Sequence, residues 1–136
     1  MIPMKKPALV AALLMSMTVS GVAHAAQWRK VSSGPGNVFY IDSTKVVKKD
    51  KTRKVWSMHS YTKAQQTPEG KPYRSVKAQH LYSCEDRTAV MLSQVFYPET
   101  MGRGEPVENY IYEKFSPEEV APGSPFEKAL ARVCKR

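Results

Sequence analysis

The chain has little cysteine and few of the residues on which enzymes usually depend. Its 136 residues include 2 cysteines and 3 histidines. There is no Cys-x-x-Cys, no His-x-x-x-His, no phosphate loop and no nucleophile elbow. Two cysteines without neighbouring histidines supply too few ligands for a metal site. We therefore expect neither a cofactor nor a metal.

Long apolar runs are absent beyond the first 22 residues. The chain opens with Lys5 and Lys6, continues with an uncharged, mostly apolar run at 7–22, and reaches Ala-His-Ala at 23–25. These are the marks of a cleaved secretory signal peptide. The apolar run is short for a membrane span, which needs roughly 20 residues. We predict a signal peptide at 1–25, a single domain at 26–136 and no transmembrane segment after cleavage.

No cysteine follows the predicted cleavage site, where a bacterial lipoprotein would carry one. We therefore expect an exported protein, periplasmic or secreted, that is not anchored by lipid. In an oxidising compartment Cys84 and Cys134 indicate one structural disulfide. The bridge would close a loop of about 50 residues, which the chain-entropy model values at roughly 4 kcal/mol.

Negative charge is also scarce. The chain has 21 Lys and Arg against 12 Asp and Glu, a formal charge of +9. Without Lys5 and Lys6 the mature domain keeps +7. A basic balance attracts anionic partners over long range. In an exported protein we expect a protein or polyanionic ligand and no nucleic acid; a basic surface without a partner is the alternative.

Beyond residue 26 the chain alternates short β-rich runs with turn signals, as antiparallel sheets do. We expect about six strands, within 28–31, 38–42, 54–61, 75–84, 88–97 and 107–115. Side chains alternate between the two faces of a strand. One face of 75–84 therefore carries Val76, Ala78, His80, Tyr82 and Cys84.

The last fifteen residues predict a short helix. Ser124, Pro125 and Glu127 match a capping box with proline at the first helical position. One apolar stripe then recurs at helical spacing: Phe126, Ala129, Leu130, Val133 and Cys134. Such a short helix is marginal alone, so we expect the disulfide to fasten it. The predicted fold is α+β: an antiparallel sheet with a C-terminal helix packed on one face and tied by a disulfide.

Three features come closest to a catalytic site: His59, His80 and the Glu85-Asp86-Arg87 run. A base near an acid can serve general acid–base catalysis. A histidine on an apolar strand face is more often a hydrogen-bonded core residue, and a charged trio between two strands suits a polar turn. We expect a protein that is not an enzyme.

One stretch, KVVKKDKTRK at 45–54, is strongly basic. Its cations are Lys45, Lys48, Lys49, Lys51, Arg53 and Lys54, against Asp50 alone. Several cations near one point can hold a polyanion with little fixed geometry. The competing interpretation is a solvated hairpin connection whose lysines discourage aggregation at a sheet edge.

Several short stretches, taken in order, resemble a known family. They are Trp28, VFYID at 38–42, Val55-Trp56, the strand from Ser75 to Cys84 with Arg87 beyond it, Met-Gly-Arg-Gly at 101–104 and the PGSPFE…VC ending. Together they resemble the surface-adhesin protein E family over essentially the whole mature chain. The resemblance implies a six-stranded sheet whose concave face holds the disulfide-tied helix. It also implies binding of host matrix and serum proteins such as vitronectin, laminin and plasminogen.

The family's named member is a lipoprotein of the outer membrane, and this chain lacks the cysteine that would carry the lipid. We find no binding motif that matches position by position. The leading hypothesis is an exported, non-catalytic binding module. The alternative is a periplasmic inhibitor or accessory factor of a cell-envelope enzyme, because small disulfide-closed β domains suit rigid inhibitory loops.

Overall fold

A computed structural model describes residue 3 and residues 25–113 and 116–135. The predicted signal peptide therefore lies almost wholly outside the described residues. The elements are β1 (Trp28–Gly34), β2 (Asn37–Asp42), β3 (Val47–Lys49), β4 (Thr52–Gln66), β5 (Pro72–Ser83), β6 (Thr88–Tyr97), the 3-10 helix η1 (Thr100–Gly102), β7 (Glu108–Ile111), β8 (Glu118–Glu119) and α1 (Pro125–Val133). Within this part of the chain no helix is both long and apolar enough to span a membrane.

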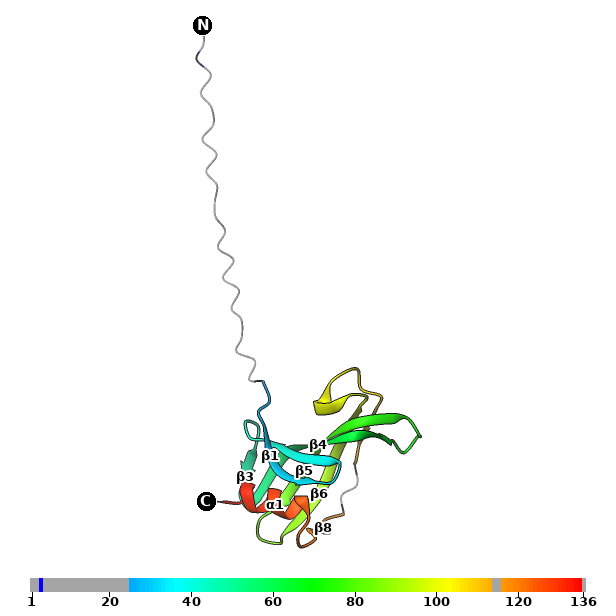
Figure 1. Cartoon of the computed structure of the whole chain (residues 1–136). Helices are drawn as coiled ribbons and strands as arrows, with labels where there is room; N and C mark the ends of the chain where they lie inside the picture. Colours follow the sequence, from blue (N-terminus) through cyan, green and yellow to red (C-terminus); the bar gives the residue numbers. More distant parts are fainter. Residues whose placement is uncertain (1–2, 4–24, 114–115, 136) are drawn as a thin grey trace.

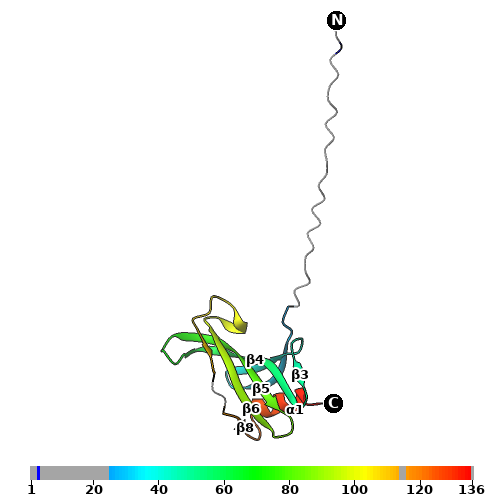
Figure 2. The same cartoon turned by 180° about the vertical axis from the view of Figure 1, so that it is seen from behind.

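The strands form one antiparallel sheet in the order β1-β2-β4-β5-β6-β7. Figures 1 and 2 show the sheet from opposite sides. This order confirms the predicted antiparallel sheet, and its six strands match the six predicted ranges. Two short strands were not expected. β3 pairs with β4, and β8 pairs with β6. Both are mostly charged and only two or three residues long. They join the sheet through backbone hydrogen bonds and have no alternating apolar pattern from which they could be predicted.

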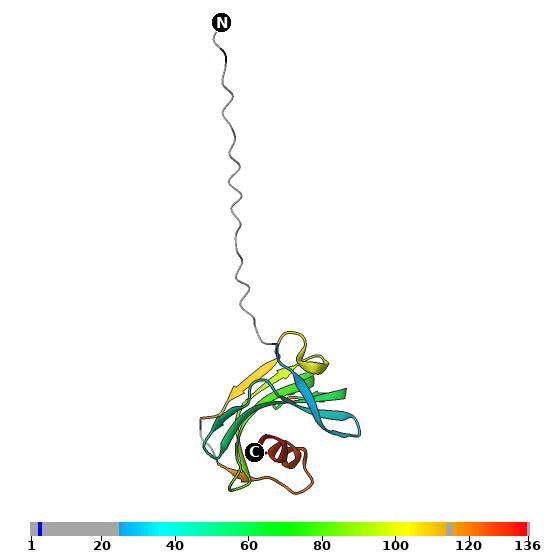
Figure 3. The same ribbon diagram turned by 90° about the vertical axis from the view of Figure 1, so that its left-hand side faces the viewer.

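The sheet curves strongly, and α1 lies in its hollow (Figure 3). Bulges interrupt the pairing of β1 with β2, of β4 with β5, and of β5 with β6. In the last of these Gln79 faces Ser93 and His80 faces Met91, so Leu92 is an extra residue. A bulge bends its strand and increases the local twist. These irregularities help to turn a flat ribbon into a concave surface that can hold a helix.

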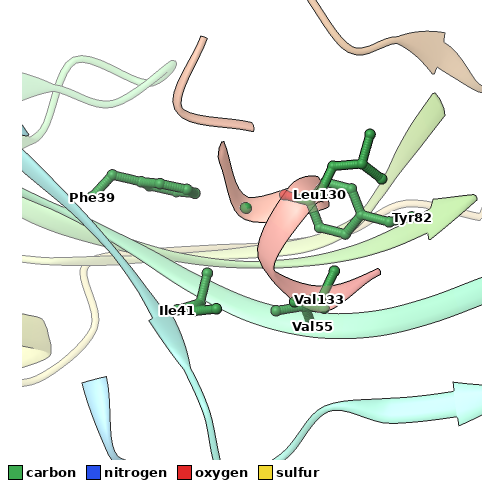
Figure 4. Packing of buried hydrophobic residues seen from close by; sticks show 7 residues of the cluster. Phe39, Ile41, Val55, Tyr82, Leu130 and Val133 are labelled. Carbon is green, nitrogen blue, oxygen red and sulfur yellow. The ribbon is translucent and has the colours of Figure 1, made fainter. Parts of the chain in front are cut away.

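The core lies between the concave face and α1. Leu130 and Val133 of the helix meet Val55, Tyr82 and Ile41 of the sheet (Figure 4). Leu130 is 1% exposed, and burying such a side chain stabilises the fold by about 1.5–3 kcal/mol. The face predicted to carry Cys84 is buried: Val76, Ala78, His80 and Tyr82 are all at most 8% exposed.

The start of α1 is capped largely as predicted. The Ser124 hydroxyl accepts a hydrogen bond from the Glu127 N–H at 3.2 Å, and Pro125 begins the helix. One detail differs from a capping box. The Glu127 carboxylate accepts from the N–H of Gly123 at 3.2 Å, because the Ser124 N–H is already bonded to the Ala121 carbonyl.

The end of α1 is fastened by a covalent bond and by an arginine. Cys84 and Cys134 form the predicted disulfide, with their Cα atoms 5.6 Å apart. The Arg53 side chain donates to the Val133 carbonyl at 3.2 Å. A cation at a helix C-terminus also opposes the negative end of the helix dipole. The disulfide and this arginine thus hold the same end of the helix against the sheet.

The convex face is partly covered by η1. The Ser75 hydroxyl donates to the Glu99 carbonyl and accepts from the Gly102 N–H at 2.8 Å. Gly102 has a φ of 69°, and a Cβ there would lie 2.5 Å from Cε of Lys77. The positive φ favours glycine, and a larger residue would also displace the end of the Lys77 side chain. Ser75, on the face opposite Cys84, is consequently fully buried.

Candidate functional site

The two histidines of the sheet belong to its packing. The His59 ring lies 4.5 Å from the Phe39 ring, centroid to centroid, and burial lowers the pKa of His59. His80 is 5% exposed. Burial, followed by the nearby His59, lowers the pKa of His80 to about 4. Among the described residues neither histidine hydrogen-bonds to a carboxylate.

The Glu85-Asp86-Arg87 run is the turn between β5 and β6. The Arg87 N–H bonds to the Ser83 carbonyl, and the Asp86 N–H bonds to the Ser83 hydroxyl. Glu85 pairs with Lys51, and Arg87 lies 3.6 Å from a Glu127 oxygen. Each member of the trio has a structural contact. The described parts of the chain also contain no cluster of three or more His, Cys, Asp or Glu that could hold a metal.

A row of aromatic rings crosses the concave face beyond the helix. Successive centroids lie between 4.5 and 6.4 Å apart along Phe39, His59, Tyr61, Tyr73, Phe96, Tyr110 and Tyr112. The Tyr110 hydroxyl donates to the Glu108 carboxylate, which raises the pKa of Tyr110 to about 12. Tyr97 lies instead near Lys77, whose ammonium is 4.9 Å from the Tyr97 ring centroid. Most of the tyrosines therefore pack against one another and stiffen the sheet.

The predicted basic residues differ in their surroundings. Arg53 donates to the carbonyls of Val133, Asp50 and Thr52, so it is a structural residue. Lys51 pairs with Glu85 at 2.8 Å. The other four are exposed, and none forms an ion pair within the described residues: Lys45, Lys48, Lys49 and Lys54.

The exposed lysines of the hairpin also divide between two faces. Lys48 lies opposite Arg53, and residues opposite each other in an antiparallel pair share a face. Lys48 therefore lies on the side of the sheet that holds α1. Lys49 lies opposite Thr52 and Lys54 opposite Val47, on the other side.

A second set of cations lies on the outer face of α1 and was missed by sequence reasoning. Lys128, Arg132 and Lys135 are exposed and border one shallow depression with Val31. Lys128 and Arg132 are four residues apart and therefore share one side of α1, a signal that the sequence carried. Lys135 follows two residues after the helix ends. β3 lies beside the C-terminal end of α1 (Figures 1 and 2). We call the set Lys48, Lys128, Arg132 and Lys135 the basic surface.

Comparisons with known proteins agree with this architecture. The structure of Haemophilus influenzae protein E matches with a TM-score of 0.53 and 18% identity, over 80% of this chain and 91% of that chain. A second crystal form gives a TM-score of 0.54 at 18% identity, over 81% and 95%. Protein E from non-typeable Haemophilus influenzae gives 0.52 at 18% identity, over 81% and 85%. At this identity the likeness shows the fold.

A search of curated protein sequences gives no significant match. The family profile described as surface-adhesin protein E matches residues 28–135, which includes all the strands and the helix. This confirms the resemblance inferred from the sequence. The chain therefore belongs to the surface-adhesin protein E family.

Proposed function

We propose that this chain is an exported, non-catalytic binding module that holds an anionic ligand on its basic surface. Membership of an adhesin family supports a binding role. The Cys84–Cys134 bridge supports export, because such bonds persist in oxidising compartments. The predicted signal peptide at 1–25 supplies the route, and the mature protein is periplasmic or secreted.

The observation that carries the proposal is the contact between the basic β3–β4 hairpin and the C-terminal end of α1, which is itself basic along its exposed side. Lys48 comes from the β3–β4 hairpin, Lys128 and Arg132 come from α1, and Lys135 follows just after the end of the helix. Arg53 holds the two segments together through the Val133 carbonyl. The fields of four cations add on that surface and attract dense negative charge.

The ligand is a chain with repeated negative charges. Sulfated polysaccharides and acidic stretches of host proteins both present such charge, and exposed lysines bind both without a fixed geometry. The Lys128 and Lys135 side chains have no partner among the described residues. They can therefore turn toward a ligand without first breaking an ion pair.

The test compares three charge-reversal variants of the purified protein on immobilised heparin and on immobilised polyglutamate. The first alters the basic surface: Lys48→Glu, Lys128→Glu and Lys135→Glu. The second alters the other side of the hairpin: Lys45→Glu, Lys49→Glu and Lys54→Glu. The third is a matched control at exposed positions elsewhere: Arg29→Glu, Lys63→Glu and Arg103→Glu.

We expect the first variant to elute at much lower salt than the control, although both lose the same charge. All three should keep their stability within about 0.5 kcal/mol per substitution, because the positions are exposed. Retention of the parent should fall steeply with salt, since the Debye length shrinks from roughly 10 Å at 0.1 M to about 3 Å at 1 M. Equal elution of the first and third variants would show that net charge alone causes retention. Stronger retention of the parent on heparin would identify a sulfated polysaccharide as the ligand. Stronger retention on polyglutamate would identify an acidic stretch of a protein.

A further inference from the structure

A cavity lies at the opposite end of α1 from the basic surface. It has a volume of about 670 Å³ and lies between β6, β8 and the start of the helix, which are neighbours in Figures 1 and 2. Much of its lining is apolar, with Ala89, Met91, Val120 and Phe126 among the residues that form it. Pockets for small organic ligands occupy about 300–1,000 Å³ and are mostly apolar with a few polar groups.

One of those polar groups is His80. Its side chain lines the cavity, and the residue is 5% exposed. The Nδ1 atom of His80 is buried and has no hydrogen-bond partner among the described residues. A buried polar atom without a partner costs about 1–3 kcal/mol. A ligand that hydrogen-bonds to Nδ1 would remove this cost, so the atom favours an occupant with one polar group in an apolar body.

The charge around the cavity is negative, in contrast to the rest of this basic chain. Glu118 and Glu119 of β8 line it and are exposed. Neither forms an ion pair in the described part of the chain, and among the described residues that line the cavity there is no lysine or arginine. The start of α1 contributes only about half a positive charge, and Glu127 already lies there. Glu118 lies opposite Ala89, on the His80 side of the sheet, whereas Glu119 lies opposite Thr88 on the other side. The full negative charge of Glu118 therefore outweighs the helix start.

We propose that this cavity binds a small hydrophobic amine. The apolar body enters between β6 and Phe126, a polar group of that body hydrogen-bonds to His80, and the ammonium lies at Glu118 of β8. The proposal is independent of the basic surface, because the two sites carry opposite charge and involve different residues.

The experiment uses three fluorescent probes that share one naphthalene sulfonamide: cationic dansylcadaverine, neutral dansylamide and anionic dansylglycine. Each is titrated with the purified, disulfide-bonded protein, and the blue shift and gain in emission report entry into an apolar site. We expect saturable binding in the order dansylcadaverine, dansylamide, dansylglycine, with at least five-fold between the first and the last. The absence of saturable binding by any probe would overturn the proposal. So would equal or tighter binding of dansylglycine.

Four variants locate the site. Ala121→Trp fills the mouth of the cavity from an exposed position and should weaken all three probes more than ten-fold. The pair Glu118→Gln and Glu119→Gln should weaken dansylcadaverine alone, by about five-fold. The pair Glu69→Gln and Glu105→Gln is a control with the same charge change at exposed positions outside the cavity. His80→Phe should weaken the probes by roughly two- to ten-fold, as expected for one lost hydrogen bond.

Circular dichroism spectra that match the parent show that each variant is folded. An unchanged affinity in folded Ala121→Trp would place the probe elsewhere and overturn the proposal. If the two glutamine pairs weakened dansylcadaverine binding equally, the proposed contact between the ammonium and β8 would be overturned. An unchanged affinity in folded His80→Phe would overturn the hydrogen bond to His80.

Discussion

At the scale of single residues, this protein holds several polar groups in places where water cannot reach them. The Asp42 carboxylate is 2% exposed and accepts from the N–H and hydroxyl of Thr44, at 3.0 and 2.6 Å. It also accepts from the Gln27 N–H at 3.2 Å. These bonds explain why a buried carboxylate is tolerated at the end of β2. His80 lacks such bonds within the described residues and stays neutral instead.

The neutral state of His80 makes stability depend on pH. Burial lowers the pKa of His80 to about 4, whereas in the unfolded chain it is about 6.5. Above pH 6.5 the side chain is neutral in both states. Between pH 6.5 and 4 the unfolded chain takes up a proton that the folded protein does not, so stability falls as the pH falls. With about 1.4 kcal/mol for each pH unit, the loss by pH 4.5 is about 2–3 kcal/mol.

Urea unfolding at pH 7.5 and at pH 4.5 measures this loss. His80→Phe keeps an aromatic ring and has no proton to gain, so the variant should lose about 2–3 kcal/mol less than the parent between the two pH values. The carboxylates titrate in both proteins and cancel in the comparison. The same loss in parent and variant would show that His80 does not cause the pH dependence.

At the scale of elements, α1 is too short to persist alone and depends on what it contacts. It has nine residues, and isolated helices of that length are marginal in water. Ser124 caps its start, Leu130 and Val133 pack on the sheet, and Cys134 and Arg53 fasten its end. Both ends are therefore held by contacts outside the helix.

Removal of the disulfide tests how far the helix depends on it. The double variant Cys84→Ser and Cys134→Ser leaves no free thiol. We expect it to lose about 2–5 kcal/mol, because the bridge no longer restricts the unfolded chain across a separation of 50 residues. Urea unfolding of both proteins measures the difference. The Leu130→Ala variant, with an expected loss of about 2–5 kcal/mol, serves as a comparison for helix packing. An unchanged urea midpoint in the double serine variant would contradict the expectation.

At the scale of the whole molecule, α1 separates two surfaces of opposite charge. Glu118 and Glu119 lie near its start, and Arg132 and Lys135 lie at its end. This arrangement agrees with the helix dipole at both ends. A helix of nine residues is about 13 Å long, which exceeds the Debye length of about 8 Å at physiological salt.

The two proposed sites should therefore act independently at 0.15 M salt. We expect the Lys48, Lys128 and Lys135 variant to bind dansylcadaverine as the parent does. We likewise expect the Glu118 and Glu119 variant to keep the parent's elution from heparin. Titration of dansylcadaverine with and without saturating heparin measures the coupling directly. A change of more than about two-fold in the affinity for dansylcadaverine would show that the two surfaces are coupled. The free-energy effects of changes at distant sites usually add to within about 0.3–0.5 kcal/mol.

The sequence by itself determined much of the architecture. The features that predicted it are local ones in the sequence. They are the alternation of apolar and polar side chains along 75–84, the serine and proline at the start of α1, and the presence of just two cysteines. Local chemistry is enough to predict a strand face, a helix start and a disulfide, and the predicted sheet and tied helix are confirmed. Ordered short stretches also predicted the family, which the match over 28–135 confirmed.

Tertiary structure alone decided where the charged residues lie relative to one another. KVVKKDKTRK is one basic run in the sequence, yet pairing with β4 sends Lys48 and Lys49 to opposite faces and commits Arg53 to the Val133 carbonyl. The cavity at His80 likewise needs β5, β6, β8 and α1 together. The physical reason is that strand register and helix docking are set by long-range contacts, and a one-residue bulge such as the one at Leu92 reverses the face on which later side chains lie.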